Sequence, residues 1–376
     1  MRNQAIRRAV AIVTTVGTAA SVFGQTGFVE VEPNETKAQA TSVVGMVAGD
    51  FITGNTIGAL ATPGPDSLDT FRIKTAALPP AIYRHRLMLT TKGTAGHTGS
   101  LRGLSQTNGI INAGTDIAIQ TTNGGTNPSR FSQWYGFGRQ EEVYYRVTGA
   151  ATTTGNYTST LETAAVTPVV MSTQFLSGPM TITTVGQTGA TQVDTDLVVY
   201  DANLAPVAGF SNDDEPAPGT TLGSKLTRSF APGTYYLAIS NFNVCNNRSA
   251  PADDSNRQAP VMDFPDGVAN SSISPANVSF RITDSAIGNV LTTVTKSSPY
   301  DVLWYQFVVV PPALPCYANC DESTAPPILN VNDFQCFLNA YAVGTSYANC
   351  DNSTSEPVLN VNDFQCFLNA FAVGCS

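Results

Sequence analysis

The sequence predicts a mainly β protein in which two antiparallel β-sandwich domains precede a small, disulfide-linked α-helical module. Between residues 28 and 310, short stretches alternate apolar and polar side chains, as Phe71 and Ile73 alternate with Arg72. This is the period of a half-buried strand. Segments rich in Gly, Pro, Asn and Asp separate these stretches, and no helical period persists among them. The last sixty or so residues instead contain one unit of about thirty residues twice, which marks an internal duplication.

Residues 1–24 have the organisation of a secretory signal peptide. Arg2, Arg7 and Arg8 precede an apolar run over residues 9–20, and small residues follow as far as Gly24. We expect cleavage after Gly24, with Ala20 as second choice, and a protein that is secreted or attached to the cell surface; a buried N-terminal helix is the alternative. No later stretch approaches the length of about eighteen apolar residues that a membrane span needs, so no span is expected after cleavage.

The composition restricts the partners. Charged residues make up 12% of the chain and the formal net charge is −9. Because nucleic-acid recognition needs a basic surface, this balance argues against nucleic acid. Six of the seven cysteines lie beyond residue 315, and export would make disulfides their expected state.

Residues 25–166 are expected to form the first sandwich. Val143, Tyr145 and Val147 alternate with Tyr144 and other neighbours, and turn sequences at 62–67 and 123–129 separate such strands. The opening EPNET at 32–36, the sequence DSLDTFRI at 66–73 and the ending VYYRVTG at 143–149 resemble a pre-peptidase C-terminal (PPC) domain. That resemblance implies a jelly-roll-like sandwich of the kind appended to secreted peptidases and other exported proteins.

Residues 167–312 are expected to repeat this theme. The sequences DTDLVVYD at 194–201 and SFAPGTYYLAIS at 229–240 again resemble strands of a PPC domain, although the EPN opening is missing and a long insertion occupies 245–272. The last strand, at 302–310, is apolar on both sides and is expected inside its sheet. The proline-rich stretch 311–315 should act as a stiff spacer, with the tail module assigned to residues 313–376.

Each copy of the tail repeat predicts one helix. Asn330 and Asp333 are spaced as a variant capping box, and Gly344 stands where a left-handed residue would end the helix. Apolar residues recur at helical spacing between them, so one face of each helix should pack on the other helix. In the two copies these residues are Phe334, Phe337, Leu338 and Tyr341, and Phe364, Phe367, Leu368 and Phe371.

An oxygen-rich loop precedes each helix, and the doubled pattern N-x-D-x-S…L-N-x-x-D-F resembles a dockerin of the cysteine-bearing GC type. The resemblance implies EF-hand-like calcium loops and docking onto a cohesin-like or other cell-envelope protein. An Asn at the first ligand position and a Thr in place of the turn glycine depart from the pattern, and helix caps with Asx turns are the alternative reading. The implied ligands are Asn319, Asp321, Ser323, the Ile328 carbonyl, Asn330 and Asp333, then Asn349, Asp351, Ser353, the Val358 carbonyl, Asn360 and Asp363.

The duplication also predicts disulfides inside each repeat. Cys320 and Cys336 correspond to Cys350 and Cys366 under the thirty-residue shift. Each repeat should therefore join its own loop to its own helix, giving the pairs Cys320–Cys336 and Cys350–Cys366.

The outer cysteines follow from symmetry. Shifted by one repeat, Cys375 falls on Thr345 and Cys316 falls on Ser346, which are neighbours in the chain. If a pseudo-two-fold axis relates the helices, Cys316 and Cys375 are neighbours in space, and their bond closes the module into a ring. The alternative pairs one of them with Cys245, which we expect to be unpaired.

Recognisable catalytic motifs are not found in the sequence. His85 falls in an alternating run and His97 in a glycine-rich stretch, so neither is expected to be catalytic. Asp194 and Asp196 could serve as an acid–base pair but more often such residues end turns or strands. The run Asn212–Glu215 could bind calcium at a sandwich edge, with a solvated loop as the alternative.

The function expected from these patterns is non-enzymatic: an exported protein whose dockerin-like module anchors it to a surface or assembly, with calcium as the implied cofactor. One alternative is a glycan-binding component of a polysaccharide-degrading system, because clustered aromatic residues can stack on sugars. A further alternative is a secreted hydrolase with an unrecognised site. The aromatic cluster comprises Phe131, Trp134, Tyr135 and Phe137.

Overall fold

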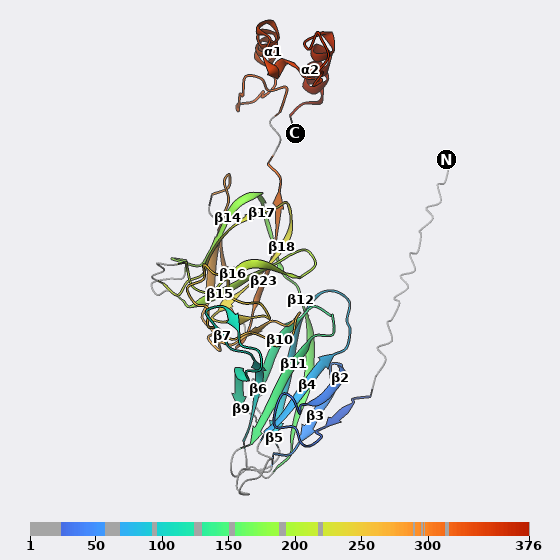
Figure 1. Cartoon of the computed structure of the whole chain (residues 1–376), viewed down its shortest axis with the longest axis vertical. Helices are drawn as coiled ribbons and strands as arrows, with labels where there is room; N and C mark the ends of the chain where they lie inside the picture. The colour runs from blue at the N-terminus through green and yellow to red at the C-terminus, as the bar shows by residue number, and fades with distance from the viewer. Residues whose placement is uncertain are drawn as a thin grey trace, which may run out of the picture.

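The computed structural model describes residues 24–56, 68–91, 96–123, 130–149, 155–187, 193–216, 221–288, 290–294, 296, 298–312 and 316–375. The expected signal peptide, apart from Gly24, lies outside these residues. So do the expected turn at 62–67, most of that at 123–129, and residues 313–315 of the expected spacer at 311–315. Figure 1 shows two β-sandwiches and a helical unit following one another along the long axis of the molecule.

The first sandwich contains two five-stranded sheets. One has the order β1-β3-β12-β5-β10, with strands β1 (Gly27–Val29), β3 (Phe51–Gly54), β12 (Tyr157–Val166), β5 (Ile82–Thr91) and β10 (Phe131–Gly136). The other has the order β2-β4-β11-β6-β9, with β2 (Thr41–Met46), β4 (Leu68–Thr75), β11 (Glu142–Gly149), β6 (His97–Gly103) and β9 (Ile117–Asn123). A small hairpin, β7 (Gln106–Thr107) with β8 (Ile110–Ile111), lies beside them.

The second sandwich follows from residue 169 and is built in the same way. Its five-stranded sheet has the order β13-β23-β18-β15-β16, with β13 (Val169–Leu176), β23 (Leu303–Val310), β18 (Gly233–Asn241), β15 (Thr195–Tyr200) and β16 (Pro206–Asn212). Its four-stranded sheet has the order β17-β14-β21-β22, with β17 (Lys225–Phe230), β14 (Gly178–Thr183), β21 (Val278–Thr283) and β22 (Val290–Val294). As expected, β23 is an interior strand, paired with β13 on one side and β18 on the other.

The sheets are mainly antiparallel, as predicted, but three of them carry a parallel strand at one edge. The pairs β1/β3, β2/β4 and β13/β23 run parallel. In the first sandwich, β1 and β3 belong to one sheet, and β2 and β4 belong to the other. The chain therefore crosses to the opposite sheet between the two strands of each pair, and β3 runs parallel to β1 as β4 does to β2. A parallel pair needs such a crossover and cannot be closed by a tight turn.

The two sandwiches share an apolar core where they meet. Val198 and Tyr200 on β15 and Trp304 on β23 pack with Tyr135 and Phe137 of the first sandwich. The Trp304 ring lies 6.0 Å from the ring of Tyr135 and 5.8 Å from that of Phe137, measured between centroids. The outer face of the second sandwich is therefore buried at this junction.

The insertion in the second sandwich crosses to the first. It carries the hairpin β19 (Val244–Cys245) and β20 (Ala269–Asn270). The backbone amides of Tyr135 and Val268 donate to each other's carbonyl oxygens at 2.6 and 3.0 Å, and Cys245 and Met262 belong to the core of the first sandwich. Residues distant in sequence thus complete that core.

The tail contains α1 (Val331–Val343), the 3-10 turn η1 (Ser346–Ala348) and α2 (Val361–Val373). Asn330 caps α1 in a capping box with Asp333, and Gly344 adopts the left-handed conformation at its end, as predicted. Phe337 is fully buried. Leu338 is 37% exposed, so the apolar face of α1 is narrower than predicted and leaves this residue outside the contact with α2.

Candidate functional site: the helical tail

The tail is a covalently closed unit. Cys316 is bonded to Cys375, with Cα atoms 5.3 Å apart, and this bond closes the ring between the ends of the unit. The two further bonds, Cys320–Cys336 and Cys350–Cys366, each join a loop to the helix that follows it. These are the pairs expected from the duplication. Cys245 is buried and carries a free thiol.

The two repeats pack with approximate two-fold symmetry. The Tyr317 hydroxyl donates to the carbonyl of Tyr347 at 2.6 Å, and the Tyr347 hydroxyl donates to the carbonyl of Tyr317 at 2.5 Å. Between the helices the rings of Phe337 and Phe367 are stacked, with centroids 4.2 Å apart. The pseudo-two-fold relation that places Cys316 beside Cys375 is thus present in the packing.

The first loop brings four of its expected ligands together around Ser323. The Ser323 amide donates to Oδ1 of Asn319 at 3.1 Å and to Oδ1 of Asp321 at 3.0 Å. The Ser323 hydroxyl donates to the carbonyl oxygen of Ile328 at 3.0 Å. Side-chain and carbonyl oxygens that are distributed over ten residues of sequence therefore converge on one small region.

The closing acid of the first loop joins the helix start to this region. Asp333 is buried, and its Oδ2 accepts from the Asn330 amide at 2.8 Å while its Oδ1 accepts from the Asp321 amide at 3.2 Å. The Asn330 side chain instead accepts from the Asn332 amide at 2.8 Å as the helix cap. Of the six expected ligands, Asn330 is thus directed toward the helix rather than the loop oxygens.

The second loop repeats this arrangement with one difference. Oδ1 of Asp363 accepts from the Asp351 amide at 3.2 Å, and the Ser353 hydroxyl donates to the Val358 carbonyl at 2.8 Å. Asn360 caps α2 as Asn330 caps α1. Oδ1 of Asn349, however, is buried without a hydrogen-bond partner, so this loop holds an acceptor whose hydrogen-bonding capacity is unused.

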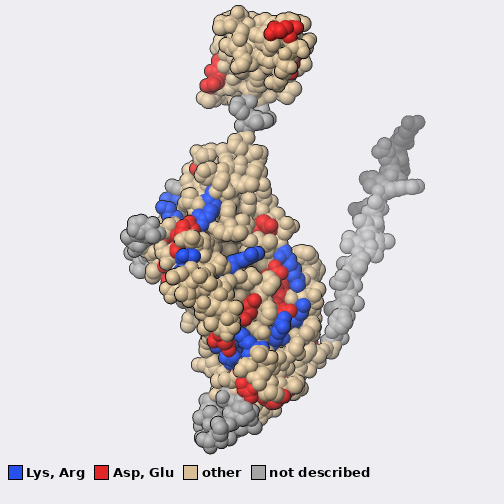
Figure 2. Space-filling model, in the orientation of Figure 1, with Lys and Arg blue, Asp and Glu red and all other residues tan. Residues whose placement is uncertain are grey.

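The tail is strongly acidic. From residue 313 onward the sequence has six Asp and Glu residues and no Lys, Arg or His, and Figure 2 shows acidic but no basic side chains on the visible face of this unit. Hydrogen bonds from Ser323, its backbone amide first, hold the pKa of Asp321 below its usual value. Burial is the largest single influence on the pKa of Asp363 and by itself would raise it. Hydrogen bonds from backbone amides, including those of Asn360 and Asp351, together outweigh burial and hold this pKa below its usual value.

This donor set suits calcium better than other metals. Each loop offers two carboxylates, an amide oxygen, a hydroxyl and a carbonyl oxygen, and the carboxyl groups of Asp321 and Asp333 contact each other, as do those of Asp351 and Asp363. Hard oxygen ligands without nitrogen or sulfur favour Ca²⁺ or Mg²⁺, and Ca²⁺ accepts flexible sets of about six to eight oxygens. The residues therefore fit a calcium ion whose shell is completed by water.

Apolar side chains are also exposed on the tail, in matching places of the two repeats. Val331 and Val361 at the helix starts are 77% and 75% exposed, and Val343 and Val373 at the helix ends are 80% and 87% exposed. Exposed valines thus occur at equivalent positions of the two repeats, at both ends of each helix.

The aromatic cluster of the first sandwich does not form a sugar-binding platform. Phe131, Trp134, Tyr135 and Phe137 are each at most 2% exposed. Stacking on a sugar needs an exposed ring face, so the glycan-binding hypothesis loses the residues on which it depended. The rings lie in the cores of the sandwiches and of their junction because β10 carries side chains that are buried on both sides.

The histidines are buried within strands. Nδ1 of His85 lies 3.0 Å from Oγ1 of Thr163, and the ring stacks on Trp134. Burial lowers the pKa of His85 to about 4. His97 begins β6 rather than lying in a loop, and burial lowers its pKa as well. Both rings therefore stay neutral near pH 7.

A group of acids that the sequence did not single out lies in the first sandwich. One carboxylate oxygen each of Glu30, Glu32 and Asp69 lie within 4.8 Å of one another. Each has a donor: the Tyr157 hydroxyl for Asp69 at 2.5 Å, the Asn55 amide for Glu30 at 2.9 Å and the Asn34 amide for Glu32 at 3.2 Å. The nearest signal in the sequence is that Glu32 and Asp69 lie within the EPN and DSLDTF motifs, and that Glu30 lies two residues before EPN.

Comparison with models of known protein families finds no match, and comparison with curated proteins likewise finds none. Among the residues that the structure describes, none of the helices has the length and apolar character needed to cross a membrane. What the tail does is therefore argued below from its own geometry.

Proposed function

We propose that this chain is a non-enzymatic exported protein whose tail is a dockerin-like module, which anchors two PPC-like sandwiches to a cohesin-like or other cell-envelope protein. The observation that supports this most directly is the repetition of exposed valines at Val331, Val343, Val361 and Val373. Each helix carries one of these valines at its first residue and one at its last. Leaving four exposed is consistent with a surface that another protein covers.

Calcium would order the loops that carry this surface. Asp321 and Asp333 belong to the first loop and Asp351 and Asp363 to the second, and each loop leads directly into a helix start. A bound cation would offset the repulsion between the paired carboxylates and hold Val331 and Val361 in place. Binding would be weaker than in loops with more carboxylates, because charge count tunes calcium affinity.

The test is capture of partners from an envelope extract of the cells that produce the protein, using the full chain as bait. The double variant Val343→Asp with Val373→Asp should lose the captured protein, because two charges would enter the apolar surface. Val44→Asp is the matched control, since Val44 is an exposed valine of β2, 61% exposed, and this variant should capture as much as the parent.

Chelation gives a second arm. Capture by the parent should fall in EGTA and return with added calcium. The double variant Asp321→Asn with Asp351→Asn should capture as little partner protein in calcium buffer as the parent does in EGTA. Equal capture by the parent and the double valine variant would refute the docking surface. Capture that is lost with the valines but unaffected by EGTA would refute only the calcium dependence.

A further inference from the structure

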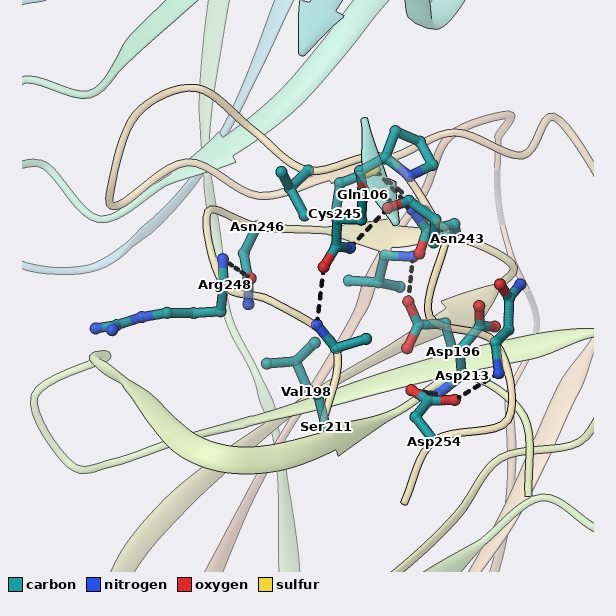
Figure 3. A pocket seen from close by; sticks show the side chains of 16 residues that line it. Gln106, Asp196, Val198, Ser211, Asp213, Asn243, Cys245, Asn246, Arg248 and Asp254 are labelled. Carbon is teal, nitrogen blue, oxygen red and sulfur yellow. Dashed lines mark hydrogen bonds between the residues drawn. The ribbon is translucent and has the colours of Figure 1, made fainter. Parts of the chain in front are cut away.

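A second group of acids lies in the second sandwich, near its contact with the first. Asp194 directly precedes β15, and Asp213 and Asp214 directly follow β16. One carboxylate oxygen of each lies within 4.8 Å of the others. Asp196 on β15 and Asp254 in the insertion lie beside them, and Figure 3 shows these two with Asp213 around one cavity.

Two of these carboxylates are held by backbone amides. Asp254 accepts from the amides of Asp213 and Asp214 at 2.9 and 3.2 Å, and Asp196 accepts from the amide of Val244 at 2.8 Å. These bonds fold the segment after β16 against the insertion. The backbone of Asp213 is thereby fixed, and its side chain is directed toward the other acids.

The carboxylate of Asp213 is the exception in this group. Asp213 is 3% exposed, and neither of its side-chain oxygens has a hydrogen-bond partner. Oδ1 of Asp194 is likewise buried and unpartnered. None of the five acids forms an ion pair with a Lys, Arg or His among the residues that the structure describes.

Such a group is unstable as a set of bare anions. Burying a carboxylate without a partner costs several kcal/mol, and like charges nearby add to that cost. Burial first, then the charges of Asp196 and Asp254, raise the pKa of Asp213 to about 11. Burial also raises the pKa of Asp194 to about 6. The group must therefore take up either protons or a cation.

The space beside Asp213 suits a hydrated ion. The cavity measures about 30 Å³ and is lined by Asp196, Asp213 and Asp254 together with Asn243 and Cys245. That is room for one or two water molecules, which could complete the shell of an ion bound to Asp213; Asp194 and Asp214 do not line this cavity.

We propose that Asp213, with Asp194 and Asp214, binds a calcium ion that joins the start of β15 to the segment after β16. Asp254 would act as a positioning residue, because it holds the backbone of that segment. Three carboxylates from two segments make a flexible, all-oxygen ligand set, which suits Ca²⁺ better than Mg²⁺ with its stricter octahedral geometry. Of the residues proposed from sequence, Asn212 and Glu215 do not join the group. The Asn212 side chain bonds the Asp214 carbonyl and the Lys225 amide, and Glu215 bonds the Thr221 amide.

Calorimetric titration of the full, metal-stripped chain with CaCl2, and separately with MgCl2, tests the proposal. Asp213→Asn should bind one calcium fewer than the parent, whereas Asp321→Asn with Asp351→Asn should keep the calcium bound by the sandwich. Asp253→Asn is the matched control, because Asp253 lies next to Asp254 but pairs with Arg228 at 2.8 Å, and it should bind as the parent does. If the tail loops bind no calcium, the parent should still bind one calcium ion more than Asp213→Asn.

Thermal unfolding provides a second readout. Without metal, Asp213→Asn should melt at a temperature equal to or above that of the parent, because the Asn side chain is buried neither as a charge nor at the cost of taking up a proton. Calcium should raise the melting temperature of the sandwiches in the parent and not in the variant. Equal calcium stoichiometry in parent and variant, a lower metal-free melting temperature of the variant, or equal affinity for Mg²⁺ and Ca²⁺ would each overturn the proposal.

Discussion

The helical tail and the paired sandwiches are stabilised by different means. The tail buries only Ala318, Phe337, Ala348 and Phe367 as a continuous core and adds three disulfides. The sandwiches contain their cysteine as a free thiol and bury three apolar clusters, one of them at the junction. The difference follows from size, since a small unit cannot bury enough apolar surface to be stable without cross-links.

The same contrast applies to their carboxylates. In the tail, Asp333 and Asp363 accept hydrogen bonds from backbone amides at both side-chain oxygens. In the second sandwich, Asp213 is buried with both oxygens unpartnered. Backbone donors at a helix start stabilise a carboxylate wherever the helix forms, whereas the sandwich offers Asp213 only other acids.

The largest expected effect is on the core shared by the sandwiches. Trp304→Ala should destabilise both sandwiches by about 3–5 kcal/mol, because it leaves a cavity among Tyr135, Phe137 and Tyr200. Urea unfolding followed by the fluorescence of the remaining Trp134 measures this. Trp304→Phe should recover most of the loss, and helicity of the tail should not change. A loss under 1 kcal/mol would mean that the sandwiches do not depend on the junction.

A smaller effect is expected from opening the ring of the tail. Cys316→Ser with Cys375→Ser should destabilise the tail by about 2–4 kcal/mol. Circular dichroism at 222 nm reports on the tail, because α1 and α2 are the only α-helices among the described residues. Tryptophan fluorescence reports on the sandwiches, which contain both Trp residues. Movement of the fluorescence transition in this variant would contradict the independence of the two regions.

The smallest expected effect is a difference in pH response. Asp213 has a folded-state pKa of about 11 against an ordinary value of 3.8, so its protonated form stabilises the fold at low pH and this stability is lost as pH rises. Between pH 6.5 and 8, the contribution of Asp213 to the stability of the metal-free parent should decline by up to about 1.4 kcal/mol per pH unit. The buried histidines and Lys296 act in the opposite sense, because their pKa values are lowered and the unfolded state binds more protons than the folded one. The decline due to Asp213 is therefore measured as the difference between the parent and Asp213→Asn.

The variant and the tail provide the controls for this response. Asp213→Asn should flatten the decline, and saturating calcium should do the same in the parent. The stability of the tail should change in the opposite sense and at lower pH. The pKa of Asp363 is lowered, so the stability that its carboxylate contributes is lost only as pH falls below the ordinary pKa of an aspartate. Equal pH dependence of the metal-free parent and of Asp213→Asn from pH 6.5 to 8 would contradict the unpartnered state of Asp213.

Local patterns in the sequence determined much of the tail. The duplication, the Asn330–Asp333 capping box and the disulfide pairs depend on residues that are near in sequence or related by one shift. Strand alternation likewise located the strands around Phe71 and Tyr145, whose side chains are buried. The cap and the strands follow from backbone geometry within a few residues, whereas the disulfide pairs follow from the symmetry of the repeat.

Only the tertiary structure decided the remaining features. The alternation of side chains along β15 assigns them to two faces, and both faces are buried. Leu197 and Val199 face the core of the second sandwich, while Val198 and Tyr200 face the shared core. Parallel edge strands, the insertion that completes the first sandwich, and the meeting of Asp194 with Asp213 all depend on which distant segments pair. The physical reason is that burial and charge proximity are set by contacts between elements far apart in the chain, and a periodic pattern identifies a face without identifying what will cover it.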